Sequence, residues 1–296
     1  MSLDEDSVLL EQFIQQRKHR TGSDSPVYSQ ETQRSYRTAG QAFLLWLSKE
    51  EISLAGLDQK ILEKWKKSLN GALISRVHAV TVVRSFVKYA SKHTPCPRLT
   101  VPQFKKVVPP RHYLSSEEIE HSIKEVRSKL HPERREAVIY TTLGFGLKTS
   151  ELSDLTREQL TETNEHPEEF SLLSDSEWCF FQYLPTQPSR PEKKRIIPVR
   201  TGFAKQYTEY MAKLSQDQTY VFSRILNCNH IGGRGMRRLI EESKICLQDL
   251  RNTYIFDLIC KGLNGKAIAK AAGITLLSAQ ECIKQLKSSR KNTARV

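Results

Sequence analysis

A proline-rich, basic segment divides this chain into two parts. Five prolines fall within residues 94–112 (TPCPRLTVPQFKKVVPPRH), among several basic residues and no acidic ones. Because proline lacks an amide hydrogen and fixes its own φ, this stretch favours extended backbone over helix. Ser115, Glu117 and Glu118 then form the pattern of a helix N-cap followed by acidic first-turn residues. We expect a basic linker at about 94–112 and a domain boundary near residue 108.

The part before the linker, residues 1–107, is patterned as helices. Apolar residues recur at helical spacing in four stretches, which cover residues 7–20, 29–50, 57–69 and 74–93. Each stretch has one apolar side that must be buried, so together they predict a small helical domain in which these sides pack against one another.

The part after the linker, residues 113–296, combines helices with a short β region. Helices are predicted at 115–130 and 132–146. The segments EEFSLLSDSEWCFFQYL (168–184) and KKRIIPVR (193–200) are rich in apolar β-forming residues, and a polar loop with prolines joins them. The patterns are helical again from there to the end. The expected fold is therefore mainly α with a small antiparallel β-sheet.

The chain is strongly basic. Its 296 residues carry a formal net charge of +13, and the pI is about 9.5. A field of this sign attracts polyanions, of which nucleic acid is the commonest in a cytosol. A basic soluble protein without such a partner is the alternative. No apolar run approaches the roughly 18 residues of a membrane span, and the acidic start MSLDEDSVLL is unlike a signal peptide. We expect a cytoplasmic, nucleoid-associated protein that binds no membrane.

The six cysteines are scattered through the sequence without a CxxC pair. Disulfide frameworks and zinc sites need cysteines, or cysteines and histidines, at close and regular spacing. Cys228 and His230 come nearest to a ligand cluster, but they lack two further ligands at suitable spacing. We expect thiols without a chemical role, no metal and no cofactor.

Three segments, in order, resemble motifs of the tyrosine recombinase (phage integrase) family. YTTLGFGLKTSELSDLTREQL (140–160) is similar to the family's TGLRxSEL helix junction, and KKRIIPV (193–199) to the strand after its β-hairpin. LQDLRNTYIFDLICKGLNGKAIAKAAGIT (247–275) follows the pattern HxLRHTFAT…G…xxIxxLLGH without a gap. The resemblance implies a SAM-like core-binding domain for DNA at 1–107 and a catalytic-like domain at 113–296.

The resemblance also implies a site that handles a DNA phosphodiester. Two arginines bind the non-bridging oxygens, because a planar guanidinium bonds phosphate through two nitrogens and stabilises the charge of the pentavalent state. A hairpin lysine and a histidine move the protons. A tyrosine attacks phosphorus and forms a covalent link, so that no cofactor is needed.

The cationic positions of this site are partly kept. The first arginine position holds Lys148, which keeps the charge without the two-nitrogen geometry and is equally well explained as a surface lysine at a helix start. Glu151 matches an acidic residue of the family that could orient this cation. On the hairpin, Arg190 stands where the lysine belongs, although a guanidinium is a poor proton donor at neutral pH. Lys193 or Lys194 could substitute for it if the loop is shifted.

Arg251 is the one full match, and we expect it to bind phosphate. Gln248 and Ile274 replace the two histidines. Gln248 can donate a hydrogen bond to phosphate but cannot transfer a proton near neutral pH, and Ile274 can do neither of these. Ile283 occupies the nucleophile position, and no tyrosine follows Tyr254 in the sequence. The expected phosphate contacts are Arg251, Lys148, Arg190, Lys193, Lys194 and Gln248.

This pattern predicts a recombinase-like protein that binds double-stranded DNA but has lost the chemistry of cleavage. The alternative is an active site-specific recombinase with an unorthodox nucleophile, for which Cys282 is an unproven substitute, or with a tyrosine supplied by a partner subunit. A third hypothesis is an interaction module that binds only protein. Because the family's C-terminal segment docks on a neighbouring subunit, we expect residues 279–296 to contact a second copy, an active recombinase or DNA.

Overall fold

A computed structural model describes residues 3–16, 30–104, 111–173, 176–185, 194–223 and 230–293. The chain divides into two units, residues 1–108 and 109–296, and each unit buries a hydrophobic core of its own. Among the described residues, no helix combines the length and the apolar character needed to span a membrane.

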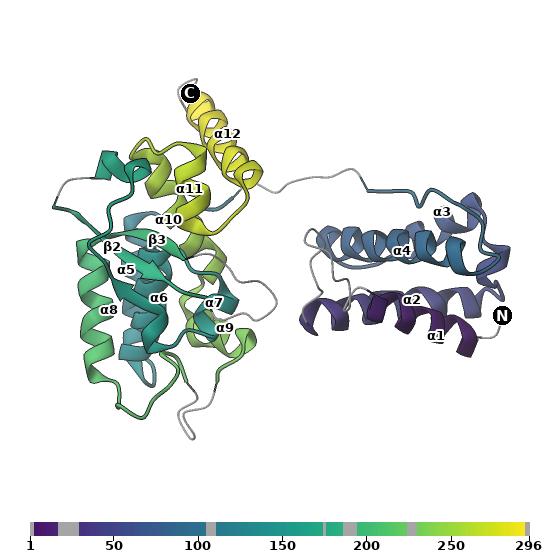
Figure 1. The fold of residues 1–296 in the computed structure, drawn as a ribbon, viewed down its shortest axis with the longest axis horizontal. Coiled ribbons are helices and arrows are strands. Elements are labelled where there is room, and N and C mark those ends of the chain that lie inside the picture. The colour runs from purple at the N-terminus through teal and green to yellow at the C-terminus, as the bar shows by residue number, and fades with distance from the viewer. Residues whose placement is uncertain are drawn as a thin grey trace. The chain divides into compact units, whose positions relative to one another are not determined.

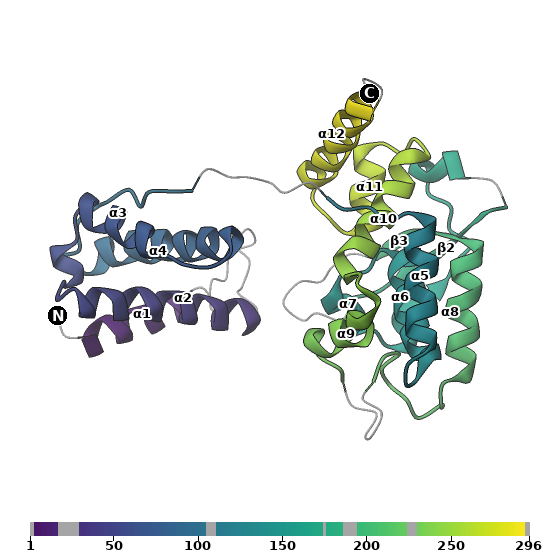
Figure 2. The same cartoon turned by 180° about the vertical axis from the view of Figure 1, so that it is seen from behind.

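The described part of the first unit is helical, as the sequence predicts. Its helices are α1 (Leu3–Gln16), α2 (Gln30–Lys49), α3 (Gln59–Ser68) and α4 (Leu73–His93). Helices α1, α2 and α4 pack against one another, and Figure 2 shows α1 and α2 lying along α4. Phe13, Phe43 and Phe86 are fully buried at their centre.

The predicted linker contains no helix or strand over its described residues. Its first part, residues 94–104, packs on the first unit, where Cys96 and Val101 are buried. The ring of Phe104 lies under two cations of this unit, 4.7 Å from Lys66 Nζ and 5.3 Å from Arg76 Cζ. The described residues of the linker therefore lie on a folded surface.

The second unit contains a three-stranded antiparallel sheet, in the order β1 (Leu160–Glu162), β2 (Trp178–Tyr183) and β3 (Arg195–Arg200). Phe181 pairs with Ile197 at the centre of the β2–β3 register. The predicted fold class, mainly α with a small antiparallel sheet, is confirmed.

The predicted β region begins too early in the sequence. Residues Glu168–Leu173 form a 3-10 helix, not a strand. Phe170 and Leu173 are buried while Leu172 is 64% exposed, so the buried positions are three residues apart, as in a helical turn. A strand would bury alternate residues instead.

Helices surround the sheet. They are α5 (Ser116–Arg127), α6 (Pro132–Phe145), α7 (Thr149–Ser153), α8 (Thr201–Lys213), α9 (Gly233–Ile240), α10 (Leu247–Cys260), α11 (Gly265–Ala272) and α12 (Leu276–Thr293). The sheet lies against α6 and α8, with α5 beside α6, while α10 packs on α6 and α11 on β3 (Figures 1 and 2). The predicted N-cap of α5 is confirmed, because Ser115 and Glu118 form a capping box.

Candidate functional site

The turn between α6 and α7 places Lys148. Helix α6 is capped by Gly146 at φ 57°, where a Cβ would lie 2.1 Å from Cδ1 of Tyr254. Tyr254 is itself fixed, because its buried hydroxyl donates a hydrogen bond of 3.1 Å to the carbonyl oxygen of Pro198. Only glycine fits a left-handed conformation at such a close approach. The turn therefore has little freedom, and Lys148 becomes the N-cap residue of α7.

Glu151 is a buried carboxylate on the first turn of α7, with 7% of its surface exposed. Its Oε2 accepts a 2.7 Å hydrogen bond from the Lys148 amide, and its Oε1 lies 3.4 Å from Lys148 Nζ. Arg195 donates to both oxygens, at 3.2 Å each. Burial alone would raise the pKa of this carboxyl, but the charges of Arg195 and Lys148 outweigh it and hold the pKa below the ordinary glutamate value.

Arg195, the first residue of β3, belongs to this site and was missed by the sequence analysis. Its side chain is 8% exposed and lies over the ring of Tyr183, with Cζ 4.8 Å from the ring centre. A Cβ on Gly273 would be 1.8 Å from Arg195 Nη1, so the guanidinium fits there only because residue 273 is glycine. Arg195 lies two and four residues before the buried Ile197 and Val199, so it shares their face of the strand, and this spacing was the available signal that it points inward.

Arg251 reaches the same carboxylate from α10. Its side chain is 6% exposed, its Nη2 donates a 2.7 Å hydrogen bond to the carbonyl oxygen of Ala272, and its Nη1 lies 3.9 Å from Glu151 Oε2. Burial lowers the pKa of this guanidinium; Glu151 opposes the shift and the nearby charge of Arg195 adds to it. An arginine so shifted is still protonated at neutral pH.

Lys148, Arg195 and Arg251 thus share one carboxylate, and the cluster carries excess positive charge. Two buried guanidinium nitrogens, Nε of Arg195 and Nη1 of Arg251, have no hydrogen-bond partner among the described residues. Buried donors are nearly always satisfied in folded proteins. A cluster with spare N–H donors and net positive charge is suited to bind an oxyanion such as a phosphate.

The positions of the family's two histidines and of its nucleophile hold side chains of other chemistry. Gln248 lies one turn before Arg251, and its Nε2 donates a 2.9 Å hydrogen bond to Asn252 Oδ1. Ile274 and Ile283 are partly buried and pack against the hydrophobic core. Ile274 therefore cannot transfer a proton, and Ile283 cannot attack phosphorus.

Cys282, next to the nucleophile position, is fully buried on α12. Its thiol donates a 3.1 Å hydrogen bond to the carbonyl oxygen of Ser278, and burial raises its pKa. The thiolate is the reactive form of cysteine, so this environment makes Cys282 a weak nucleophile.

The hairpin residues are only partly described. Arg190 and Lys193 lie outside the described residues. Lys194 pairs with Glu165 and lines a groove of about 620 Å³, together with Arg195 and Lys270. The structure therefore brings Lys148, Glu151 and Arg251 together, with Lys194 at the edge of an adjoining groove.

No protein-family model matches this chain, and no curated protein matches it. Solved structures do match, over nearly its full length. The XerH site-specific recombinase bound to difH substrate, in a pre-cleavage complex, superposes with a TM-score of 0.63 at 11% identity, covering 97% of this chain and 96% of that one.

Two further matches have the same character. The Tn1549 transposon integrase in complex with transposon right end DNA gives a TM-score of 0.64 at 13% identity and covers 97% of this chain and 99% of that one. A lambda integrase dimer bound to a COC′ core site gives 0.62 at 10% identity, covering 93% and 76%. At such identities the likeness is one of fold.

Proposed function

We propose, on the premise that this chain has the fold of the tyrosine recombinases and integrases, that it binds double-stranded DNA through the phosphate backbone and does not cleave it. The carrying observation is the cluster of Lys148, Arg195 and Arg251 around Glu151, with its unsatisfied guanidinium donors. Each contact with a phosphate oxygen would satisfy one such donor and neutralise part of the excess charge.

The placement of Tyr254 and Cys282 supports the proposal that the bound DNA is not cleaved. No tyrosine follows Tyr254 in the sequence, and Tyr254 is buried, with its hydroxyl bonded to backbone. Burial raises the pKa of that hydroxyl far above its ordinary value. The thiol of Cys282 is buried as well, so neither of these two described side chains is placed to attack a phosphodiester bound at the cluster.

Basic surfaces elsewhere in each unit support a DNA partner. On the first unit, Arg84, Lys88 and Lys92 follow one another at four-residue spacing along α4 and line a groove of about 460 Å³ that also includes His93. Among the described residues, no acidic side chain lines this groove. A row of cations without carboxylates is the electrostatic pattern of backbone contact with nucleic acid.

Helix α9 presents a second basic face, on the second unit. Arg234, Arg237 and Arg238 are exposed, while Met236 and Ile240 anchor the helix in the core. This helix packs against α7, which begins beside Lys148. We propose that α9 adds backbone contacts next to the cluster.

We propose that the C-terminal segment also contacts a partner, either a second copy of this chain or an active recombinase. Ala279, Cys282 and Leu286 are buried within their own unit, so this side of α12 is already occupied. The exposed side, which includes Gln280 and Lys287, faces solvent and is where we place that partner.

A single gel experiment tests binding and cleavage together. Protein and labelled duplex DNA are mixed at low salt, and one half is run native while the other is quenched in detergent. We expect retardation in the native gel that disappears in detergent, because no covalent link forms. An adduct that survives detergent would overturn the proposal and favour the active recombinase, whereas no retardation would favour the protein-only module.

Two variants of the cluster test more sharply whether it binds DNA. Lys148→Gln and Arg251→Gln each remove one cation, and we expect each to weaken binding at low salt about tenfold or more. Lys124→Gln, on the exposed side of α5, removes the same charge outside the cluster and serves as the control. Equal affinities for all three variants, with unchanged thermal unfolding, would exclude the cluster as the binding site.

A further inference from the structure

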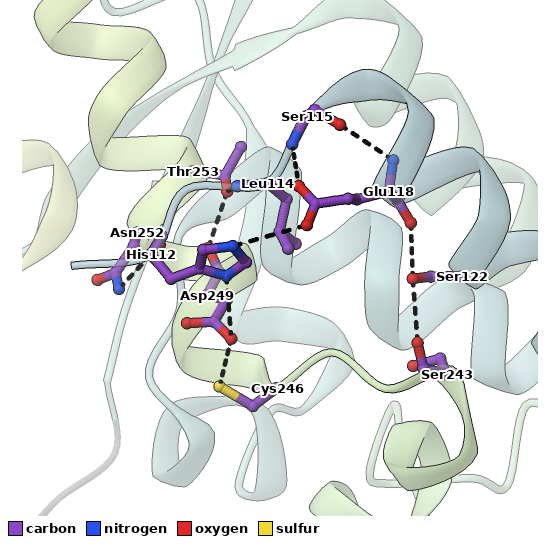
Figure 3. A network of polar contacts seen from close by, with 10 residues as sticks. All are labelled: His112, Leu114, Ser115, Glu118, Ser122, Ser243, Cys246, Asp249, Asn252 and Thr253. Atoms are coloured by element: carbon purple, nitrogen blue, oxygen red, sulfur yellow. Dashed lines mark hydrogen bonds and ion pairs between the residues drawn. The ribbon is translucent and has the colours of Figure 1, made fainter. Parts of the chain in front are cut away.

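Residues 111–115, which we call the strap, begin the second unit and are fixed to α10. The amide of Leu114 donates a 2.9 Å hydrogen bond to Thr253 Oγ1, and Asn252 Nδ2 donates one of 3.3 Å to the carbonyl oxygen of His112. Figure 3 shows the side chains of Asn252 and Thr253 directed from α10 toward the strap. The strap is therefore attached to the helix that carries Arg251, at the two residues that follow it.

The acidic residues near the strap face His112. Its Nδ1 lies 3.7 Å from Asp249 Oδ2 and its Nε2 lies 3.6 Å from Glu118 Oε1 (Figure 3). Asp249 also accepts a hydrogen bond from the Cys246 thiol, and Glu118 from the Ser115 amide. Both carboxylates thus have partners other than an arginine.

Arg111 is the arginine of the strap, and it contacts the residue that follows Arg251 on α10. Its Nη1 donates a 3.3 Å hydrogen bond to Asn252 Oδ1, the same oxygen that accepts from Gln248. Its Nε is buried and has no hydrogen-bond partner among the described residues, and no ion pair involves Arg111 there. The side chain as a whole is only partly buried, so a ligand can reach it.

The positive charge of Arg111 acts on the pKa of Arg251. Burial is the main cause that lowers the pKa of the Arg251 guanidinium, and the positive charges of Arg195 and Arg111 lower it further, against the effect of Glu151. The mutual repulsion of these cations in the free protein would be relieved by an anion placed among them.

We propose that Arg111, held by Asn252, is a further phosphate-binding residue of the site formed by Lys148, Arg195 and Arg251. The inference rests on the proposed function. Arg111 would supply a guanidinium on the Gln248 side of the site, where the side-chain amide of Gln248 is hydrogen-bonded to Asn252. A cation at this position binds phosphate but cannot transfer a proton at neutral pH.

The test is the salt dependence of duplex binding by Arg111→Gln, Arg111→Lys and Lys124→Gln. Fluorescence anisotropy of a labelled duplex of about 30 base pairs is read between about 50 and 200 mM salt, since log K falls with log salt by about 0.9 for each phosphate neutralised. We expect Arg111→Gln to bind about tenfold more weakly at the lowest salt and to reduce the slope by about one. Arg111→Lys should keep the slope, and Lys124→Gln should match the wild-type protein.

The outcomes separate this inference from the proposed function. Wild-type protein that does not bind the duplex at the lowest salt would overturn both. Wild-type binding with an unchanged slope for Arg111→Gln would overturn only the role of Arg111, as would an equal loss in Lys124→Gln. Thermal unfolding of each variant, with Arg111→Lys as the conservative change, distinguishes a lost contact from a lost fold.

Discussion

Glu151 is the residue on which the cluster depends. Its carboxylate accepts hydrogen bonds from Arg195 through both oxygens and from the Lys148 amide, and it lies near Arg251. Glu151 itself is only 7% exposed. A buried carboxylate of this kind is stable only while its partners remain, and the same holds for a buried guanidinium. Glu151 therefore keeps three cations close together in the absence of an external anion.

The stability of the protein should depend on pH through Glu151. Because its pKa in the folded state lies below the ordinary value of 4.5, its contribution is complete above that value and is lost as the pH falls through the folded pKa. Glu151→Gln should lower the free energy of unfolding by about 3 kcal/mol at pH 7. This deficit should shrink as the pH falls below about 4.5, which denaturant unfolding of both proteins would measure.

Glu120→Gln, on the exposed surface of α5, is the matched control and should differ little from the wild-type protein at any pH. A deficit for Glu151→Gln that stays constant down to pH 3 would contradict the ion-pair role of this carboxylate.

At the scale of elements, the C-terminal end of α11 connects the two arginines. Ala272, its last residue, accepts the hydrogen bond from Arg251, and Gly273, its C-cap at φ 59°, makes room for Arg195. Asn264 caps the other end of this helix, because its side-chain oxygen accepts hydrogen bonds of 3.0 Å from the amides of Lys266 and Ala267. The short helix therefore sets the separation of the two guanidinium groups.

Gly273→Ala should harm both stability and binding. A residue with a Cβ in the left-handed conformation lowers the stability of the folded state by about 1–2 kcal/mol. The new methyl group would also displace Arg195 from its place. Gly262→Ala is the matched control, because Gly262 also has a positive φ, of 87°, but among the described residues a Cβ there would meet Leu172 alone, at 3.8 Å. We expect both variants to lose stability in thermal unfolding and only Gly273→Ala to bind duplex DNA more weakly. Equal affinities would contradict the role of Arg195.

At the scale of the whole molecule, the two units have separate hydrophobic cores. The core of residues 1–108 is built on α1 to α4 and the start of the linker, and that of residues 109–296 on the sheet and its helices. Segments with complete cores can fold independently. Basic residues are exposed on both units, on α4 and on α9.

Fragments 1–108 and 109–296 should therefore each unfold cooperatively on heating, as circular dichroism would record. If both units contact one duplex, the intact chain should bind about a hundredfold more tightly than either fragment, because the linker raises the effective concentration of the second unit. An equimolar mixture of the unlinked fragments is the control and should not restore this affinity. Full affinity in fragment 109–296 alone would contradict a DNA contact by the first unit.

Local patterns were enough to predict the helices of the first unit, the cap of α5, strands β2 and β3 and the resemblance to a known fold, but not strand β1. They also singled out Lys148, Glu151 and Arg251, which the structure brings together, because each lies in a continuous motif whose spacing is fixed by one helix or turn. The six-residue 3-10 helix at Glu168–Leu173 was mistaken for strand because short apolar runs do not distinguish the two.

The sequence by itself determined the fold class and shows that no tyrosine follows Tyr254, since both depend on residue order and type. Only the tertiary structure decided that Arg195 joins Arg251 around one carboxylate, and that Arg111 bonds the residue after Arg251. The contact between Arg195 and Glu151 joins positions 44 residues apart, and that between Arg111 and Asn252 joins positions 141 apart. Such pairs are set by how the sheet, α10 and the strap pack, and no local periodicity records that packing.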